Sequence, residues 1–234
     1  MNKLKDDLNK RILVGVTAKG GKGWRKKLKE IKKYKITRFA LFIEEISPKK
    51  RKKLYKKLNK LKIEEIPLIH IKDDTTNEEL EFFKQKYHTK YFTIHEDHFS
   101  KLNEWNGFHK DLYVEFNNDN FVSKSVKVEN IGGFCIDLSH FKKGEAIKSK
   151  EFYYVTKRKS KKSYFACNHL NGYSYRLNRD IHAPTKLSQF SYLKTLPNYL
   201  FGKIIAIEMY NSIKEQLEYK KYILKLLNKK LRKN

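Results

Sequence analysis

The sequence contains few cysteines and no long apolar run. Its two cysteines both lie inside short apolar segments, which argues against the disulfide framework of a small secreted domain. No apolar stretch approaches the roughly 20 residues needed to cross a bilayer, and the N-terminal segment MNKLKDD lacks the apolar core of a signal peptide. These absences predict a cytoplasmic protein with no membrane partner, and nothing in the sequence indicates an obligate protein partner.

Acidic residues are scarce relative to basic ones. Lysine and arginine together number 53, against 26 aspartates and glutamates, which gives a formal net charge of +27. One interpretation is a polyanionic partner, above all nucleic acid. The other is a set of lysine-rich helix surfaces with no specific partner, because the lysines are spread over many predicted helices. The charge alone does not decide between the two.

Short apolar segments recur along the chain, and the apolar (39%) and aromatic (14%) fractions suffice for a substantial core. Eight segments predict strands, at residues 11–17, 38–43, 65–71, 91–95, 112–116, 133–137, 164–169 and 203–208. Helical spacing predicts helices at residues 24–34, 48–61, 77–86, 143–154, 188–196 and 212–231, with a loop at 170–186. Buried strands that alternate with helices predict parallel βαβ units.

Eight such units predict an α/β fold of the (β/α)8 TIM-barrel type, with residues 1–234 forming a single domain. The links after the fourth and fifth strands are too short for full helices. We therefore expect a trimmed barrel in which some helices are short or missing.

Six of the eight predicted strands end in an ionisable side chain: His70, His95, Glu115, Asp137, His169 and Glu208. Because the carboxyl ends of barrel strands meet at one end of the barrel, these side chains are expected to converge there. Burying them without counter-charge would be costly, and divalent cations relieve that cost. Further ligands follow in the sixth and seventh loops: His140, Asp180 and His182. Mixed imidazole and carboxylate ligation favours Zn²⁺ and also permits Mn²⁺ and Fe²⁺.

Several motifs carry a family resemblance: VTAKGG at residues 16–21, RFALF at 38–42, FCID at 134–137 followed by His140, HLN at 169–171, and the pair Asp180 and His182. Across residues 12–223 these motifs resemble the xylose-isomerase-like barrel superfamily. Within it they are most similar to endonuclease IV, the zinc-dependent abasic-site endonuclease. The segment HEDHF at residues 95–99 is also similar to the UV-damage endonuclease family.

The resemblance implies three metal sites built from nine ligands, and two or three Zn²⁺ per chain. The first would be held by His70, His95 and Glu115. The second would be held by Glu115 as a bridge, with Asp137, His169 and Glu208, and the third by His140, Asp180 and His182. The implied activity is hydrolysis of a phosphodiester in abasic or damaged DNA during base excision repair, with hydroxide as the nucleophile and Glu115, Asp137 and Glu208 as the catalytic carboxylates.

The chain departs from this family in its second and third loops, which carry Glu44-Glu45 and Asp73-Asp74. Acidic loops beside a DNA site are unfavourable. Phosphate contacts are instead predicted for basic residues elsewhere: Lys19, Lys22, Arg25, Lys142, Lys143, Arg176 and Arg179.

Two other functions remain open from the sequence. A sugar or sugar-phosphate isomerase or epimerase would hold a single divalent metal with Glu115, Asp137, His169 and Glu208, and its two glutamates would shuttle a proton. That interpretation leaves His70, His95, Asp180 and His182 without a task. A non-catalytic nucleic-acid-binding protein would use the basic charge but would not need a complete ligand set.

Overall fold

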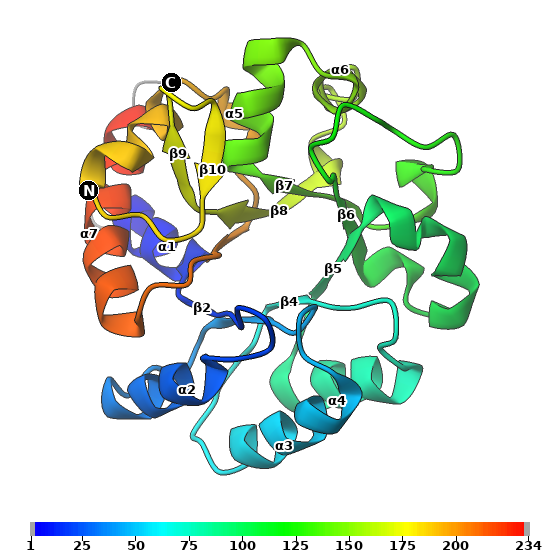
Figure 1. Ribbon diagram of the computed structural model, residues 1–234, viewed down its shortest axis with the longest axis vertical. Coiled ribbons are helices and arrows are strands. Elements are labelled where there is room, and N and C mark those ends of the chain that lie inside the picture. Colours follow the sequence, from blue (N-terminus) through cyan, green and yellow to red (C-terminus); the bar gives the residue numbers. More distant parts are fainter. Residues whose placement is uncertain (1–2, 232–234) are drawn as a thin grey trace.

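The main sheet of the molecule closes nearly into a barrel. The computed structural model describes residues 3–231, with side chains from Asp7 onward; the first two residues of the N-terminal segment and the last three of the basic C-terminus lie outside the described residues. Nine parallel strands follow the order β1-β11-β8-β7-β6-β5-β4-β3-β2, and the helices lie around them (Figure 1). The architecture is a nearly closed α/β barrel, compatible with the TIM-like class.

The barrel strands are short. They are β1 (Ile12–Leu13), β2 (Gly15–Val16), β3 (Ala40–Phe42), β4 (Leu68–His70), β5 (Tyr91–His95), β6 (Leu112–Glu115), β7 (Gly133–Asp137), β8 (Phe165–Leu170) and β11 (Ile204–Ile207). A separate antiparallel hairpin is formed by β9 (Gly172–Ser174) and β10 (Arg179–Ile181).

Helices of very different length connect the strands. The α-helices are α1 (Lys3–Arg11), α2 (Trp24–Lys33), α3 (Pro48–Leu58), α4 (Asn77–Tyr87), α5 (Leu138–Ile147), α6 (Lys150–Thr156) and α7 (Ile213–Leu231). Within residues 3–231, β5 is followed by a 3-10 segment, η1 (Glu96–Trp105), and β6 by a loop with the single-turn η3 (Val128–Asn130), in place of α-helices. These are the two positions where the sequence predicts short or missing helices.

Four predicted elements differ from the observed ones. The strand predicted at 11–17 is two strands, β1 and β2, which lie at opposite ends of the sheet order, and α1 precedes it. The helix predicted at 143–154 begins at Leu138, because the Asp137 side chain caps it, and breaks before α6. The predicted 170–186 loop contains the β9–β10 hairpin, and the 188–196 helix is the 3-10 segment η5 (Leu187–Lys194).

Side chains alternate between the inside and the outside of the barrel, as the two-residue period of a strand requires. The inside is filled by a small buried cluster: Leu13, Ala40, Phe42, Leu68, Tyr113, Cys135, Cys167, Ile204 and Ala206. A larger apolar layer lies between the strands and the helices. Both cysteines are buried and unpaired. Because of this alternation, the residue two positions after the last inward-facing residue of a strand also faces inward, at the carboxyl end of the barrel.

A side chain satisfies one free edge of the nearly closed barrel. In this sheet β2 pairs with β3 and β1 pairs with β11, so the outer edge of Gly15 has no strand partner. Gln216 of α7 takes that place: its Oε1 accepts from the Gly15 N–H at 2.8 Å, and its Nε2 donates to the Gly15 carbonyl at 3.0 Å. A Cβ on Gly15 would lie 2.0 Å from the Ile207 carbonyl oxygen, so only glycine fits at this seam.

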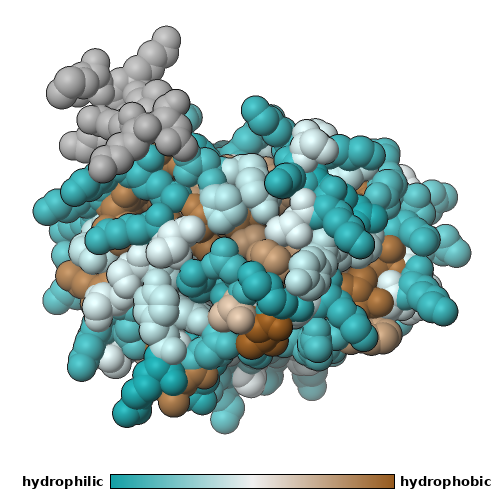
Figure 2. Space-filling view, turned by 90° about the horizontal axis from the view of Figure 1, so that it is seen from above, coloured by the Kyte–Doolittle hydropathy of each residue, from teal (hydrophilic) through white to brown (hydrophobic). Residues whose placement is uncertain are grey.

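The outer surface is dominated by hydrophilic side chains, as the space-filling view in Figure 2 shows for one face. Apolar side chains form separate small patches on that face. Within residues 3–231, no helix has the length and apolar character needed to cross a membrane.

Candidate metal centre

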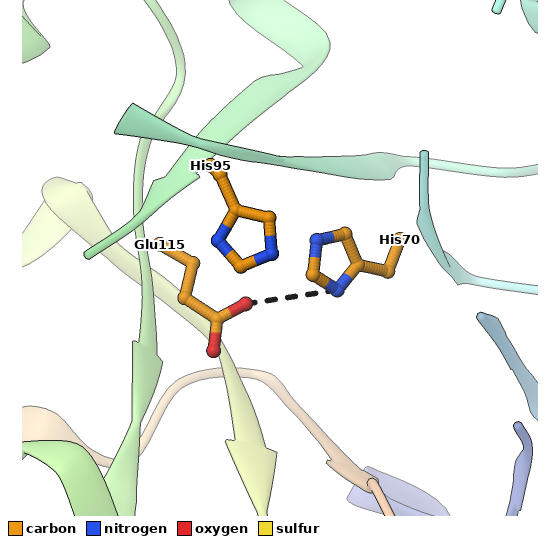
Figure 3. A group of neighbouring side chains, drawn as sticks. All are labelled: His70, His95 and Glu115. Atoms are coloured by element: carbon orange, nitrogen blue, oxygen red, sulfur yellow. Dashed lines mark ion pairs between the residues drawn. The ribbon is translucent and has the colours of Figure 1, made fainter. Parts of the chain in front are cut away.

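Imidazoles and carboxylates converge at the carboxyl ends of the barrel strands. His70 ends β4, His95 ends β5 and Glu115 ends β6, and their side chains face one another (Figure 3). The Nδ1 atom of His70 lies 3.6 Å from Glu115 Oε2, and the His70 and His95 rings are 4.7 Å apart at their centroids. These three residues form one group whose potential ligand atoms all lie within 4.8 Å.

His169 of β8 is fully buried in this arrangement. Its Nδ1 approaches Glu115 Oε2 to 2.9 Å and Glu208 Oε2 to 3.5 Å. Its other ring nitrogen, Nε2, lies 3.4 Å from the hydroxyl of Thr93. A partner on the far nitrogen fixes the orientation of a histidine and leaves the near nitrogen for a cation. Thr93 is therefore a positioning residue that the sequence did not reveal.

Asp137 serves two purposes. Its Oδ1 caps α5 by accepting from the Ser139 and His140 amides, at 2.7 and 2.8 Å. Its Oδ2 accepts from Asn171 Nδ2 at 2.9 Å. The Ser139 hydroxyl also donates to Oδ1, at 2.8 Å. Each carboxylate oxygen has about two acceptor positions, so Oδ2, which has a single donor, keeps one position for a cation. The cap also explains why His140, expected in a loop, lies in the first turn of a helix.

The third predicted metal site is assembled from two elements. His140 comes from α5, whereas Asp180 lies on β10 of the hairpin and His182 follows that strand, where the sequence predicted only a loop. These three residues form a group with ligand atoms within 4.8 Å of one another. His182 Nε2 lies 3.1 Å from Asp180 Oδ2, and this contact lowers the pKa of Asp180 to about 2 although burial opposes the shift.

The structure groups the nine predicted ligands somewhat differently from the sequence. Two predicted sets appear as groups: His70 with His95 and Glu115, and His140 with Asp180 and His182. The second predicted set does not appear as one group. The observed groups instead place His169 and Glu208 with His70, and Glu115 and Asp137 with His140. Each of His70, Glu115 and His140 belongs to two groups, and these three residues thereby link the four groups into one centre.

Glu44 is an additional acidic residue of the centre that the sequence analysis treated only as a departure from the family. It follows β3 at the position two residues beyond Phe42, which lies inside the barrel. Its Oε2 is buried and has no hydrogen-bond partner among the described residues, and the charges of Glu115 and His182 both influence its pKa. The same alternation that places the other strand-end residues could have identified it.

Burial and mutual repulsion favour the protonated form of two carboxyl groups in the centre. Burial raises the pKa of Glu208 well above its ordinary value, and the charges of Glu115 and Asp137 add to the effect. Burial also raises the pKa of Glu44 to about 8, with further contributions from Glu45 and Glu115.

The pKa values of Glu115 and His70, in contrast, are both lowered. Burial opposes the ionisation of Glu115, but the imidazoles of His169 and His70 outweigh it and lower the pKa of Glu115. Burial and the neighbouring His95 hold the pKa of His70 well below its ordinary value. A neutral imidazole beside an ionised carboxylate is the form in which both residues ligate a metal.

Unsatisfied polar atoms indicate that cations fit this centre. Buried side-chain atoms without a hydrogen-bond partner include both ring nitrogens of His70, Nδ1 of His95, His140, His169 and His182, and Oε2 of Glu44 and Glu115. Buried polar groups are normally satisfied, so a concentration of unsatisfied ones calls for an explanation. Divalent cations with nitrogen and oxygen ligands would satisfy them, and the donor set suits Zn²⁺.

Metal loading is expected to release protons. Because the pKa of Glu208 is raised well above its ordinary value and that of Glu44 is raised to about 8, bound cations are expected to expel protons from both carboxyl groups. Lowering the pH below these raised pKa values therefore weakens metal binding. Calorimetry of zinc binding in buffers with different ionisation enthalpies measures the number of protons. Glu208→Gln and Glu44→Gln should each lower it by about one, whereas Glu145→Gln should not, and an unchanged number in both variants would contradict the assignment.

The predicted phosphate-contacting residues fall into two classes. Lys19, Lys22 and Arg25 are exposed at the start of α2, and Arg176 and Arg179 are exposed on the β9–β10 hairpin. These five residues lie on segments that follow the carboxyl ends of β2 and β8, the end of the barrel that carries the metal centre.

Lys142 and Lys143 are engaged within the protein. Lys142 pairs with Glu145 at 2.6 Å, and Lys143 donates to the Asn118 carbonyl at 3.4 Å. Both are only partly exposed. These contacts make the two lysines weaker candidates for nucleic-acid binding than the exposed residues.

The acidic loops are less unfavourable to an anion than their sequence suggests. Glu45 accepts from the Gly20 amide and from the Tyr210 hydroxyl, which joins the β2–α2 loop to the barrel rim. Asp73 pairs with Lys101 at 3.0 Å and Asp74 with the buried Arg51. Basic partners therefore compensate the charges of Asp73 and Asp74, and Glu45 is held by hydrogen bonds from two neutral groups.

Comparison with known proteins yields no match: no family model fits the sequence, and neither a curated protein nor a solved structure matches it.

Proposed function

We propose that this protein is a metal-dependent phosphodiesterase that acts on abasic or damaged DNA. The observation that carries the proposal is the convergence of four overlapping ligand groups at the carboxyl end of the barrel. Overlapping groups, joined through His70, Glu115 and His140, are suited to hold two or three Zn²⁺ close together. The proposal includes the (β/α)8 form of the barrel, in which β1 and β2 count as one interrupted strand.

A polynuclear centre suits the chemistry of a phosphodiester. The cations of such a centre would supply positive charge to the phosphoryl oxygens and would lower the pKa of the attacking water. In this chain Glu115 would hold two groups at a fixed separation, since its Oε2 faces His70 and His169 while its Oε1 faces His140 at 3.9 Å. Thr93 and Asn171 orient His169 and Asp137 from behind.

The positive charge at the end of the barrel that carries the candidate metal centre supports DNA as the substrate class. Lys19, Arg25 and Arg179 are exposed there, and the net charge of +27 favours a polyanion. Lys19 is placed over the ring of Tyr210 with its nitrogen 5.5 Å from the ring centroid. Tyr210 in turn lies against His182, with ring centroids 5.4 Å apart. A basic and aromatic rim therefore borders the centre.

The proposal predicts that zinc-loaded protein cleaves a duplex oligonucleotide at an abasic site. The measurement combines strand cleavage with the metal content of the same preparation by mass spectrometry. Cleavage with two or three Zn²⁺ per chain supports the proposal. An intact substrate at high protein concentration, with those metals present, contradicts it.

The sugar isomerase remains the second candidate, and metal content separates it from the nuclease. It needs one cation held by Glu115, Asp137, His169 and Glu208. The observed groups instead divide these residues between two sets, which supports several cations. A single tightly bound metal per chain would favour the isomerase.

A further inference from the structure

The tip of the β9–β10 hairpin exposes two large apolar side chains on one turn. Tyr175 retains 55% of its accessible surface and Leu177 retains 50%. Among the described residues, exposed side chains of this size are few and lie on separate segments elsewhere, such as Ile147 at the end of α5. Two such residues on one tight turn form a projecting apolar tip.

This tip is held rigidly. The Tyr175 ring packs edge-on against the buried Tyr173, with centroids 5.2 Å apart. The Tyr173 hydroxyl donates to the side chain of Asn178, and the Leu177 amide donates to the Ser174 hydroxyl at 3.3 Å. Side chains that are already ordered lose little entropy when they bind a partner.

The tip is directly connected to the metal centre. Leu177 precedes the candidate ligand Asp180 by three residues, which separates their Cα atoms by at most about 10 Å. The strand that carries Asp180 packs against α5, which carries His140. Successive nucleotides of one strand are about 3.4 Å apart. If one phosphate of a strand lay at the metal centre, bases up to about three nucleotides away from that phosphate would therefore lie at the tip.

The charge of the turn is positive. Arg176 and Arg179 are exposed on the hairpin, and neither forms an ion pair with a carboxylate among the described residues. Guanidinium groups beside an aromatic ring match a strand of nucleic acid, whose phosphates are anionic and whose bases offer flat faces. A neutral apolar partner would leave these two charges without counterparts.

We propose that the hairpin tip binds the substrate strand, with Tyr175 and Leu177 packed against bases next to the lesion and with Arg176 and Arg179 on the flanking phosphates. This inference rests on the proposed function. An abasic site leaves the faces of the neighbouring bases open, and an aromatic or aliphatic side chain can occupy the gap. The hairpin would thus select nucleic acid with an interrupted base stack.

The test measures binding and cleavage separately. Fluorescence anisotropy with a labelled abasic duplex is compared for the zinc-loaded wild type, a Tyr175→Ala and Leu177→Ala double variant, and the control Ile147→Ala. Ile147 is 49% exposed but lies at the end of α5 opposite His140. The double variant should bind at least about tenfold more weakly, and the control should bind as the wild type does.

Hydrolysis of bis(p-nitrophenyl) phosphate provides the second measurement, because this small diester needs no hairpin. Unchanged hydrolysis together with weakened duplex binding supports the inference. Equal duplex binding by the double variant and the wild type overturns it. An equal loss of duplex binding and of small-diester hydrolysis also overturns it, because such a loss would indicate structural damage. Failure of the proposed function has a different result, since the wild type would then hydrolyse neither the small diester nor the duplex.

Discussion

Glu115→Gln is expected to reduce phosphodiester hydrolysis by on the order of a thousandfold and to lower the zinc content of the protein. Glu115 is the carboxylate that faces the most imidazoles in the centre: Oε2 approaches His70 and His169, and Oε1 approaches His140. A neutral amide has nearly the same shape but cannot compensate two cations. The bridge between neighbouring groups is therefore lost.

The measurement pairs the cleavage rate on an abasic duplex with metal analysis, and circular dichroism verifies the fold. Glu129→Gln is a matched control, because Glu129 pairs with Arg158 at 3.0 Å on the surface, away from the centre. The control should keep wild-type activity and metal content. Full activity of Glu115→Gln with its metals retained would show that this carboxylate is not part of the catalytic centre.

Gln216→Leu is expected to lower the free energy of unfolding by about 2–4 kcal/mol. Leucine has a similar volume but cannot hydrogen-bond, so the N–H and carbonyl of Gly15 would lose their partner. Gln216 Nε2 also lies 3.3 Å from the Met209 carbonyl and 3.2 Å from the Asn211 carbonyl. All these groups sit at the seam of the barrel, where no strand pairs with the free edge of Gly15.

Equilibrium unfolding in urea measures the change. Gln85→Leu on the exposed face of α4 is the control, because the Gln85 side chain is exposed and, among the described residues, hydrogen-bonds only to the Glu81 side chain, at 2.6 Å. This variant should change stability by less than about 0.5 kcal/mol. If the two variants were equally stable, the Gln216 contacts would contribute little, and the seam would be held by apolar packing alone.

The general architecture could be predicted because strand and helix periods are local properties. The apolar runs and the helical spacing indicated parallel strands alternating with helices, and the ionisable residues at the ends of six of the eight predicted strands indicated a shared site. Glu44 was not predicted as part of the centre, although its spacing from Phe42 obeys the same alternation. Gln216 lies on the buried face of α7 with Ile213 and Ile223, but the pattern alone could not say which backbone groups it would meet.

By itself, the sequence determined the alternation of buried strands and helices, the polar ending of most strands and the excess of positive charge, because each depends on neighbouring residues or on composition. Only the tertiary structure decided the rest. It showed that β1 and β2 divide one predicted strand across the seam, that Asp137 caps a helix while facing the centre, and that a hairpin rather than a loop carries Asp180. Each of these depends on contacts between segments far apart in the chain, where hydrogen-bond satisfaction and close packing select one arrangement among several that the local pattern permits.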